Sequence, residues 1–100
     1  MKYHKLVRDK IPEIIAQKGG KSVIRIAGKE EYWEKLKEKL AEELQEFSEA
    51  ENIEEMADIL EVIDAIIKFK KFNRKNLKSV KLKKLRERGG FKKKIILEES

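Results

Sequence analysis

The chain contains no cysteine and only one histidine, His4. Disulfide bonds and thiolate metal sites are therefore excluded, and one chain cannot build a zinc site from several histidines. No apolar run approaches the roughly 20 residues that a membrane-spanning helix needs. The N-terminus opens directly into mixed sequence, with no visible secretory leader. We therefore expect a cytoplasmic protein that makes no use of a membrane.

Apolar residues are scarce relative to charged ones, at 40% against 44% of 100 residues. This length predicts a single domain over residues 1–100 with a modest core, and so thin a core favours oligomerisation. The net charge of +6 is unevenly spread, because 41–64 carries only negative charges and 68–94 is strongly basic. The basic half suits nucleic acid, the phosphates of a small anionic substrate, or simply a solvated surface.

Apolar spacing and capping residues predict a mainly helical fold of about four helices. The first helix is expected to begin near Lys10 and to end at Gly19-Gly20. The other three are expected at about 29–49, about 53–72 and about 77–88. Two short β-type runs, 22–27 and 94–97, can pair as a minor two-stranded β element, which would be marginal unless packed on helices.

Four carboxylates stand at mirrored positions around a short connection at 49–52: Glu43 and Glu46 before it, Glu55 and Asp58 after it. Each pair is spaced i,i+3, which places both members on one helix face. At about 100° per residue, Glu43 and Glu55 fall inside the apolar arcs of their helices. In an antiparallel hairpin the four acids converge, and they repel one another unless a cation lies among them. The pattern therefore predicts a Mg²⁺ site and, through it, a phosphate substrate.

These acids have structural interpretations as well. Asn52-x-x-Glu55 fits a capping box, in which the Glu55 carboxylate accepts from the Asn52 amide. The other acids can be solvated, with Lys39 as an i,i+4 partner of Glu43. The mirror symmetry and the inward direction favour the metal site, because burying an unpaired carboxylate is costly.

Three blocks of the sequence are similar to one known family. Glu42-Glu43-Leu44-Gln45-Glu46 followed by Glu55-Met56-Ala57-Asp58 resembles the EExxE…ExxD signature of the MazG-type all-α nucleoside triphosphate pyrophosphohydrolases. Residues 5–15, KLVRDKIPEII, resemble the opening of a MazG-like, phosphoribosyl-ATP pyrophosphohydrolase-like subgroup. Lys84 with Arg88-Gly89-Gly90-Phe91 resembles its closing segment. The gap between Glu46 and Asp58 is shorter than in many members, which bears on the base pocket more than on the metal site.

The resemblance implies an all-α NTP pyrophosphatase-like core that holds Mg²⁺, with Mn²⁺ as a substitute. The implied ligands are Glu43, Glu46, Glu55 and Asp58. The implied reaction cleaves a nucleoside triphosphate between its α and β phosphates, giving a monophosphate and pyrophosphate, in a homodimer or homotetramer.

Roles for further residues follow from this resemblance. Glu46, with Glu42 second, is expected to orient the attacking water. The candidates for phosphate binding lie in the two other matching blocks: Arg8, Lys10, Lys84 and Arg88. Trp33 is the candidate for contact with the base, although an aromatic stripe on a helix is more often core.

Three competing functions stay open at this point. One is a phosphoribosyl-ATP pyrophosphohydrolase, which differs only in substrate. The second is a non-catalytic basic helical module that binds nucleic acid through 68–94; it leaves the inward acids without a purpose and ranks well below. The third is a structural oligomerisation domain. Nucleotide-pool house-cleaning and control of nucleotide levels both fit the expected reaction.

Overall fold

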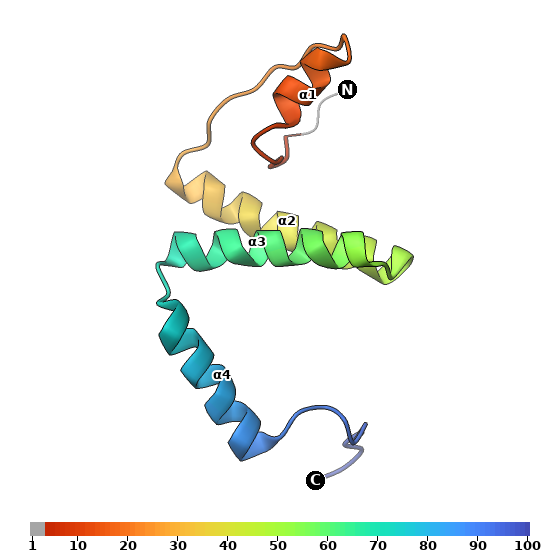
Figure 1. The fold of residues 1–100 in the computed structure, drawn as a ribbon, viewed down its shortest axis with the longest axis vertical. Helices are drawn as coiled ribbons and strands as arrows, with labels where there is room; N and C mark the ends of the chain where they lie inside the picture. The colour runs from red at the N-terminus through yellow and green to blue at the C-terminus, as the bar shows by residue number, and fades with distance from the viewer. Residues whose placement is uncertain (1–3) are drawn as a thin grey trace.

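The computed structural model describes residues 4–100 and is mainly helical, as predicted. Its four helices are α1 (Ile11–Gln17), α2 (Lys29–Ala50), α3 (Ile53–Lys70) and α4 (Arg74–Arg88). The helices α2 and α3 pack along each other as a hairpin in the middle of the molecule (Figure 1). The short α1 lies at one end and α4 extends away at the other (Figure 1). The hairpin is therefore the central structural unit, and α1 and α4 lie at opposite ends of the molecule.

A two-residue connection makes the hairpin. Glu51 ends α2 in the left-handed conformation, with φ of 52°, and its N–H donates to the Phe47 carbonyl at 2.8 Å. Asn52 then caps α3, because its side-chain oxygen accepts from the Glu55 N–H at 2.9 Å. Such a cap satisfies one of the free N–H groups at a helix start. The chain thus reverses within one turn, which sets the register of α3 against α2.

The core of this hairpin is small. Its buried apolar side chains are Leu36 from α2, which is fully buried, and Ile59 and Val62 from α3. At the open end of the hairpin, Trp33 stacks flat on Phe69 with ring centroids 5.4 Å apart, and Tyr32 meets Phe69 edge-on at 5.5 Å. Aromatic pairs in these arrangements contribute beyond their buried area. The turn closes one end of the hairpin and this aromatic cluster closes the other.

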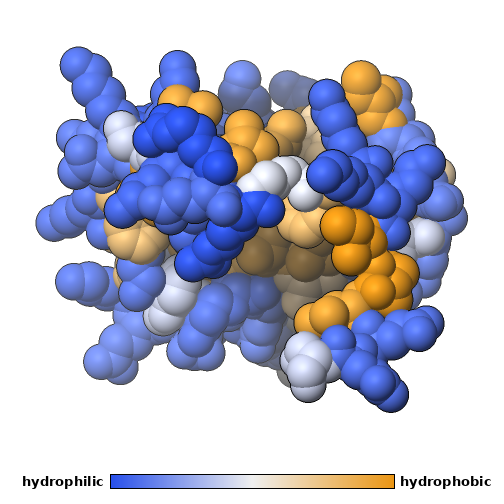
Figure 2. Space-filling view, turned by 90° about the horizontal axis from the view of Figure 1, so that it is seen from below, coloured by the Kyte–Doolittle hydropathy of each residue, from blue (hydrophilic) through white to orange (hydrophobic). Residues whose placement is uncertain are grey.

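The single chain is far from compact. Its radius of gyration is 17.9 Å and its extents are 55 × 31 × 24 Å, against about 13 Å for a compact domain of 100 residues. No residue of α4 is buried. Viewed from the end where α4 and the C-terminal segment lie, apolar residues remain uncovered between hydrophilic ones (Figure 2). Those that α4 leaves exposed are Leu77, Val80, Leu82 and Leu85.

The structure does not show the predicted two-stranded β element. Residues 22–27 and 94–97 are irregular, and no strand occurs anywhere within residues 4–100. Most of their apolar side chains are exposed, among them Val23, Ile26 and Ile96. The two runs lie toward opposite ends of the elongated chain (Figure 1), and a lone pair of strands without helices to pack on is barely stable. The β-type composition of these runs therefore finds no partner within one chain.

None of the four helices is long and apolar enough to cross a membrane, within the part of the chain that the structure describes.

Replacement of the cap residue should weaken the hairpin. We expect Asn52→Ala to lower the free energy of unfolding by about 1 kcal/mol, the usual cost of losing an N-cap. Urea unfolding followed by Trp33 fluorescence reports on the hairpin itself. Asn73→Ala is the matched control, because Asn73 caps α4 through the Asn76 N–H at 3.0 Å but α4 buries nothing. An equal loss in both variants would contradict the central place of the 51–52 turn.

Candidate metal centre

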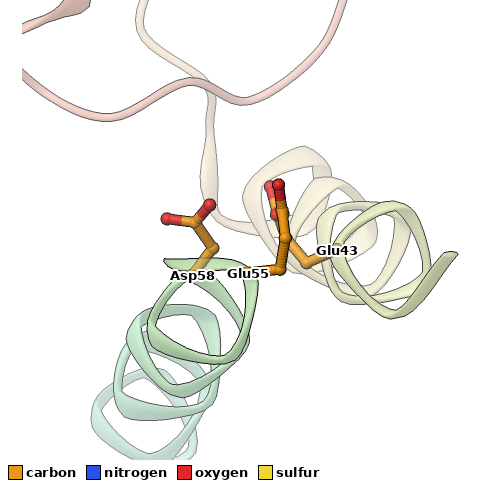
Figure 3. Close-up of side chains that lie close together, drawn as sticks. All are labelled: Glu43, Glu55 and Asp58. Atoms are coloured by element: carbon orange, nitrogen blue, oxygen red, sulfur yellow. The ribbon is translucent and has the colours of Figure 1, made fainter. Parts of the chain in front are cut away.

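Three carboxylates meet where the two helices of the hairpin face each other. Glu43 comes from the last two turns of α2, Glu55 from the first turn of α3, and Asp58 from the turn after it. Each offers an oxygen, and these three oxygens lie within 4.8 Å of one another. Figure 3 shows the carboxylates of Glu43 and Glu55 side by side, with Asp58 beside them on α3. The convergence that the mirrored spacing predicted is present for these three residues.

Two of the three acids have unsatisfied oxygens. Glu43 is only 5% exposed, and its Oε2 atom is buried without a hydrogen-bond partner. The Oε2 atom of Glu55 is also buried and unpartnered. The side chain of Asn52 makes the cap of α3, and the capping-box interpretation does not explain the orphaned Glu55 oxygen. A buried acceptor without a donor costs about 1–3 kcal/mol. Hard oxygen ligands in this number suit Mg²⁺, so the residues present fit the ion that the sequence pattern implies.

One lysine partly compensates the buried charge. The Nζ atom of Lys39 lies 3.2 Å from Glu43 Oε1 and 3.2 Å from Glu42 Oε2. Burial raises the pKa of Glu43 and Lys39 opposes that rise, while the neighbouring Glu46 adds to it. Burial lowers the pKa of Lys39, but its bonds to Glu42 and Glu43 outweigh this and leave the pKa raised. Glu43 is therefore a buried carboxylate whose charge is only partly compensated, because Lys39 contacts one of its two oxygens.

Two predicted catalytic acids lie beside this cluster. Glu46 is half-buried and outside the group of three, but near enough to Glu43 to raise the pKa of that carboxyl. Glu42 is bonded to Lys5 at 3.0 Å as well as to Lys39. The hydrogen bond from Lys5 lowers the pKa of Glu42, which burial alone would raise. Because its oxygens hold two lysines, Glu42 is poorly placed to orient a water, and Glu46 is the better candidate.

The N-terminal block reaches the acids across the hairpin. Nη2 of Arg8 lies 2.7 Å from Asp58 Oδ1. A cavity of about 420 Å³ opens beside them, within the usual range for a small-molecule site. Among the residues that line this cavity are Arg8, Lys10, Lys39, Glu43 and Asp58. The structure thus brings two of the four predicted phosphate-binding residues to the carboxylates.

The other two do not reach the site within one chain. Lys84 and Arg88 are exposed on α4, which projects from the hairpin and contributes nothing to this cavity. Within one chain, Lys84 and Arg88 therefore supply no cation to the cavity beside the carboxylates.

The base contact predicted for Trp33 is also not favoured by the geometry. One face of the indole lies on Phe69, and Lys70 Nζ stands 4.3 Å from the ring centroid. Trp33 does not line the cavity, whereas Tyr32 does. A signal for this was present in the sequence, because at about 100° per residue Tyr32 lies about 20° from Glu43 and Trp33 about 80° away. Tyr32 is the functional candidate that the sequence argument missed.

Comparisons with known proteins add little to the geometry. No family model matches the chain, and no solved structure matches it. A protein of Mycolicibacterium smegmatis, described only as uncharacterized, is 48% identical over 46 residues. That segment is 46% of this chain and 47% of the relative, so the match spans about half the length of each protein.

Removal of the buried charge should stabilise the metal-free protein. We expect Glu43→Leu to raise the free energy of unfolding by about 1–2 kcal/mol, because it removes a buried oxygen that has no partner. In that variant Lys39 still has its ion pair with Glu42. Urea unfolding in the presence of a chelator measures the effect. Glu42→Leu, which removes a half-exposed carboxylate bonded to two lysines, should give no such gain. A clear loss of stability in Glu43→Leu would mean that this carboxylate serves the fold.

Proposed function

We propose that this protein is a Mg²⁺-dependent nucleoside triphosphate pyrophosphohydrolase of the MazG type. It cleaves the bond between the α and β phosphates and releases a nucleoside monophosphate and pyrophosphate. The observation that carries the proposal is the cluster of Glu43, Glu55 and Asp58, with two orphaned buried oxygens beside a cavity that also presents Arg8 and Lys10. A site with anionic ligands on one wall and cations on another suits a metal–polyphosphate complex.

The three clustered carboxylates would hold the ion, with Glu46 as the fourth acid next to them. When bound, Mg²⁺ or its substitute Mn²⁺ supplies positive charge against the phosphate oxygens and makes a nearby water more acidic. Glu46, half-buried beside Glu43, orients the attacking water. Arg8 and Lys10 bind phosphate oxygens; the planar guanidinium favours paired contacts, so Arg8 makes the more specific one.

A second copy of the chain completes the molecule in this proposal. The apolar residues of α3 form two stripes: Ile59, Val62 and Ile66 on the face that also carries Glu55, and another stripe about 100° away. The second stripe follows a 4-3-4 spacing and consists of Met56, Leu60, Ile63 and Ile67. Leu60 is 53% exposed, although burial of a leucine contributes about 1.5–3 kcal/mol. The second stripe therefore suits a helix of another copy, in a homodimer or a homotetramer built from such dimers.

The same assembly gives the basic α4 a role. This helix carries eight basic residues and one acidic residue and buries none of them. In a dimer, Lys84 and Arg88 of one chain can approach the carboxylates of the other and meet the phosphates there. The cytoplasm, where nucleotides are abundant, is the compartment that fits this activity.

Exposure of α4 also favours one alternative. A helix with this charge, projecting from the hairpin and without a buried residue, suits phosphates of nucleic acid. Such a module would bind with an affinity that falls steeply with salt and would have no need of Glu43 and Glu55. A phosphoribosyl-ATP pyrophosphohydrolase uses the same metal centre and differs only in the substrate that it accepts.

The reaction itself is the main test. The protein is incubated with standard and modified nucleoside triphosphates and with phosphoribosyl-ATP, in Mg²⁺ or in chelator, and the phosphate products are separated. We expect monophosphate and pyrophosphate in Mg²⁺ alone. Glu55→Gln should lower turnover at least about 100-fold, because even outer-shell changes at metal sites cost roughly 10–100-fold. Glu54→Gln is the matched control, since Glu54 is the exposed neighbour in the same helical turn.

Two results would contradict the proposal. Full turnover in Glu55→Gln would remove the carboxylates from the chemistry. Absence of turnover with every substrate, in a folded protein that binds nucleic acid in a salt-dependent way, would favour the binding module instead.

The predicted dimer is tested separately. Light scattering after size-exclusion chromatography should give the mass of a dimer or tetramer for the unaltered chain. We expect Leu60→Glu to give the monomer at the same concentration, because a charge in the second stripe of α3 cannot be buried unpaired. Val23→Glu, which makes the same change at an exposed apolar residue outside the helices, should leave the mass unchanged. A monomeric unaltered chain would overturn the assembly.

A further inference from the structure

Arg8 stands at the carboxylate cluster from outside the hairpin. It precedes α1, and its Nη2 donates to Asp58 Oδ1 at 2.7 Å. The side chain is 55% exposed, so it lies at the rim of the cavity and is free to change direction. Asp58 is one of the three acids whose oxygens lie close enough to share an ion. Arg8 is therefore ion-paired with a carboxylate that would be a ligand of an ion at this centre.

Lys39, the other cation at the cluster, is attached differently. It lies on α2 itself, three and four residues before its partners, and its side chain is only 17% exposed. Its i,i+3 and i,i+4 spacing on one helix places it beside Glu42 and Glu43. Its bond to Glu43 Oε1 leaves Glu43 Oε2 buried without a hydrogen-bond partner. Lys39 thus belongs to the hairpin itself, whereas Arg8 reaches the cluster from outside it.

A bound ion would repel Arg8. Its guanidinium lies 2.7 Å from Asp58 Oδ1, and Asp58 is one of the three acids whose oxygens lie within 4.8 Å of one another. A divalent cation held by these oxygens would therefore lie within a few ångströms of Arg8. An arginine cannot lose its proton to relieve the repulsion. Two cations within a few ångströms of each other repel strongly at the low effective dielectric of a partly closed site.

We infer that Arg8 is a displaceable counter-ion of the metal centre. In the metal-free protein it neutralises Asp58; when a divalent cation binds, Arg8 gives up Asp58 and becomes free to bind a phosphate oxygen in the adjoining cavity. This rests on the metal centre of the proposed function and adds an order to it: metal first, then release of Arg8 to the anion. Arg8 thus opposes metal binding and assists phosphate binding.

The two opposite effects make the inference testable with binding alone. Mn²⁺ is titrated into the metal-free protein without nucleotide, and free Mn²⁺ is measured by electron paramagnetic resonance. We expect Arg8→Gln to bind Mn²⁺ about 3–10-fold more tightly than the unaltered protein, since it removes a competing cation. With Mn²⁺ saturating, the same variant should bind inorganic pyrophosphate at least about 3-fold more weakly, through the loss of a charge-assisted contact.

Arg25→Gln is the matched control. Arg25 forms a bidentate ion pair with Glu31 on the same helix as Glu43, at a comparable exposure. Its removal changes the net charge by the same amount but leaves the cluster intact, so Mn²⁺ affinity should stay within about twofold. Circular dichroism and Trp33 fluorescence establish that both variants are folded.

The outcomes separate this inference from the metal centre itself. Equal or weaker Mn²⁺ binding in a folded Arg8→Gln, with clear binding by the unaltered chain, would overturn the counter-ion role and leave the metal centre standing. An equal gain in Arg25→Gln would reduce the effect to net charge and overturn it too. Absence of Mn²⁺ binding in all three proteins would remove the metal centre, and the inference with it.

Discussion

The structure depends on one electrostatic conflict, the placement of three carboxylates at the interface of a helical hairpin. Glu43 is almost fully buried in a molecule whose buried apolar side chains, among residues 4–100, are only Leu36, Ile59 and Val62. A protein with so little hydrophobic stabilisation gains nothing in stability from such an arrangement. Arrangements that lower the stability of the fold are found most often at functional sites. We therefore propose that an ion bound by these oxygens explains the conflict better than a structural role does.

The rest of the hairpin follows from the need to hold these acids in register. The tight connection at Glu51 and Asn52 brings the first turn of α3 against the last turns of α2. The cap uses the Asn52 side chain, which leaves the Glu55 carboxylate available. At the far end, Phe69 packs against Tyr32 and Trp33 and keeps the helices together. The tight turn holds the two helices together at one end and the aromatic cluster at the other, and the acids lie between these two contacts.

The helix bounds and the convergence of the acids could largely be predicted from the sequence, because a periodic pattern shows which residues share a face of one helix. The spacing of four acids predicted their convergence once a hairpin was assumed, and the structure brings Glu43, Glu55 and Asp58 together and leaves Glu46 outside the group. Helix bounds were predicted to within a few residues, since Asn52, Asn73 and the glycine pairs mark them. What depends on contact between distant segments was not accessible. The bond between Arg8 and Asp58 joins residues fifty positions apart, and no periodicity encodes it.

The predicted element that the structure does not show has the same origin. The sequence pattern suggested that 22–27 and 94–97 pair as strands, but these runs lie toward opposite ends of the elongated chain. The roles of Trp33, Lys84 and Arg88 stay predictions. The helix angle places Tyr32 rather than Trp33 beside the acids, and a single chain leaves Lys84 and Arg88 on a projecting helix. In each case the deciding quantity is a distance that a sequence pattern does not contain.

Charge also determines how the N-terminal segment is attached. Lys5 bonds Glu42 and Arg8 bonds Asp58, so this segment is tied to both helices of the hairpin through their acids. These ion pairs are partly exposed, and each contributes modestly and is weakened by salt. In our proposal, a segment attached in this way is released when its partners acquire another cation, whereas one attached by a buried apolar face would not be. The acids would then act on the chain twice: they form the proposed metal centre, and they position the segment that carries Arg8.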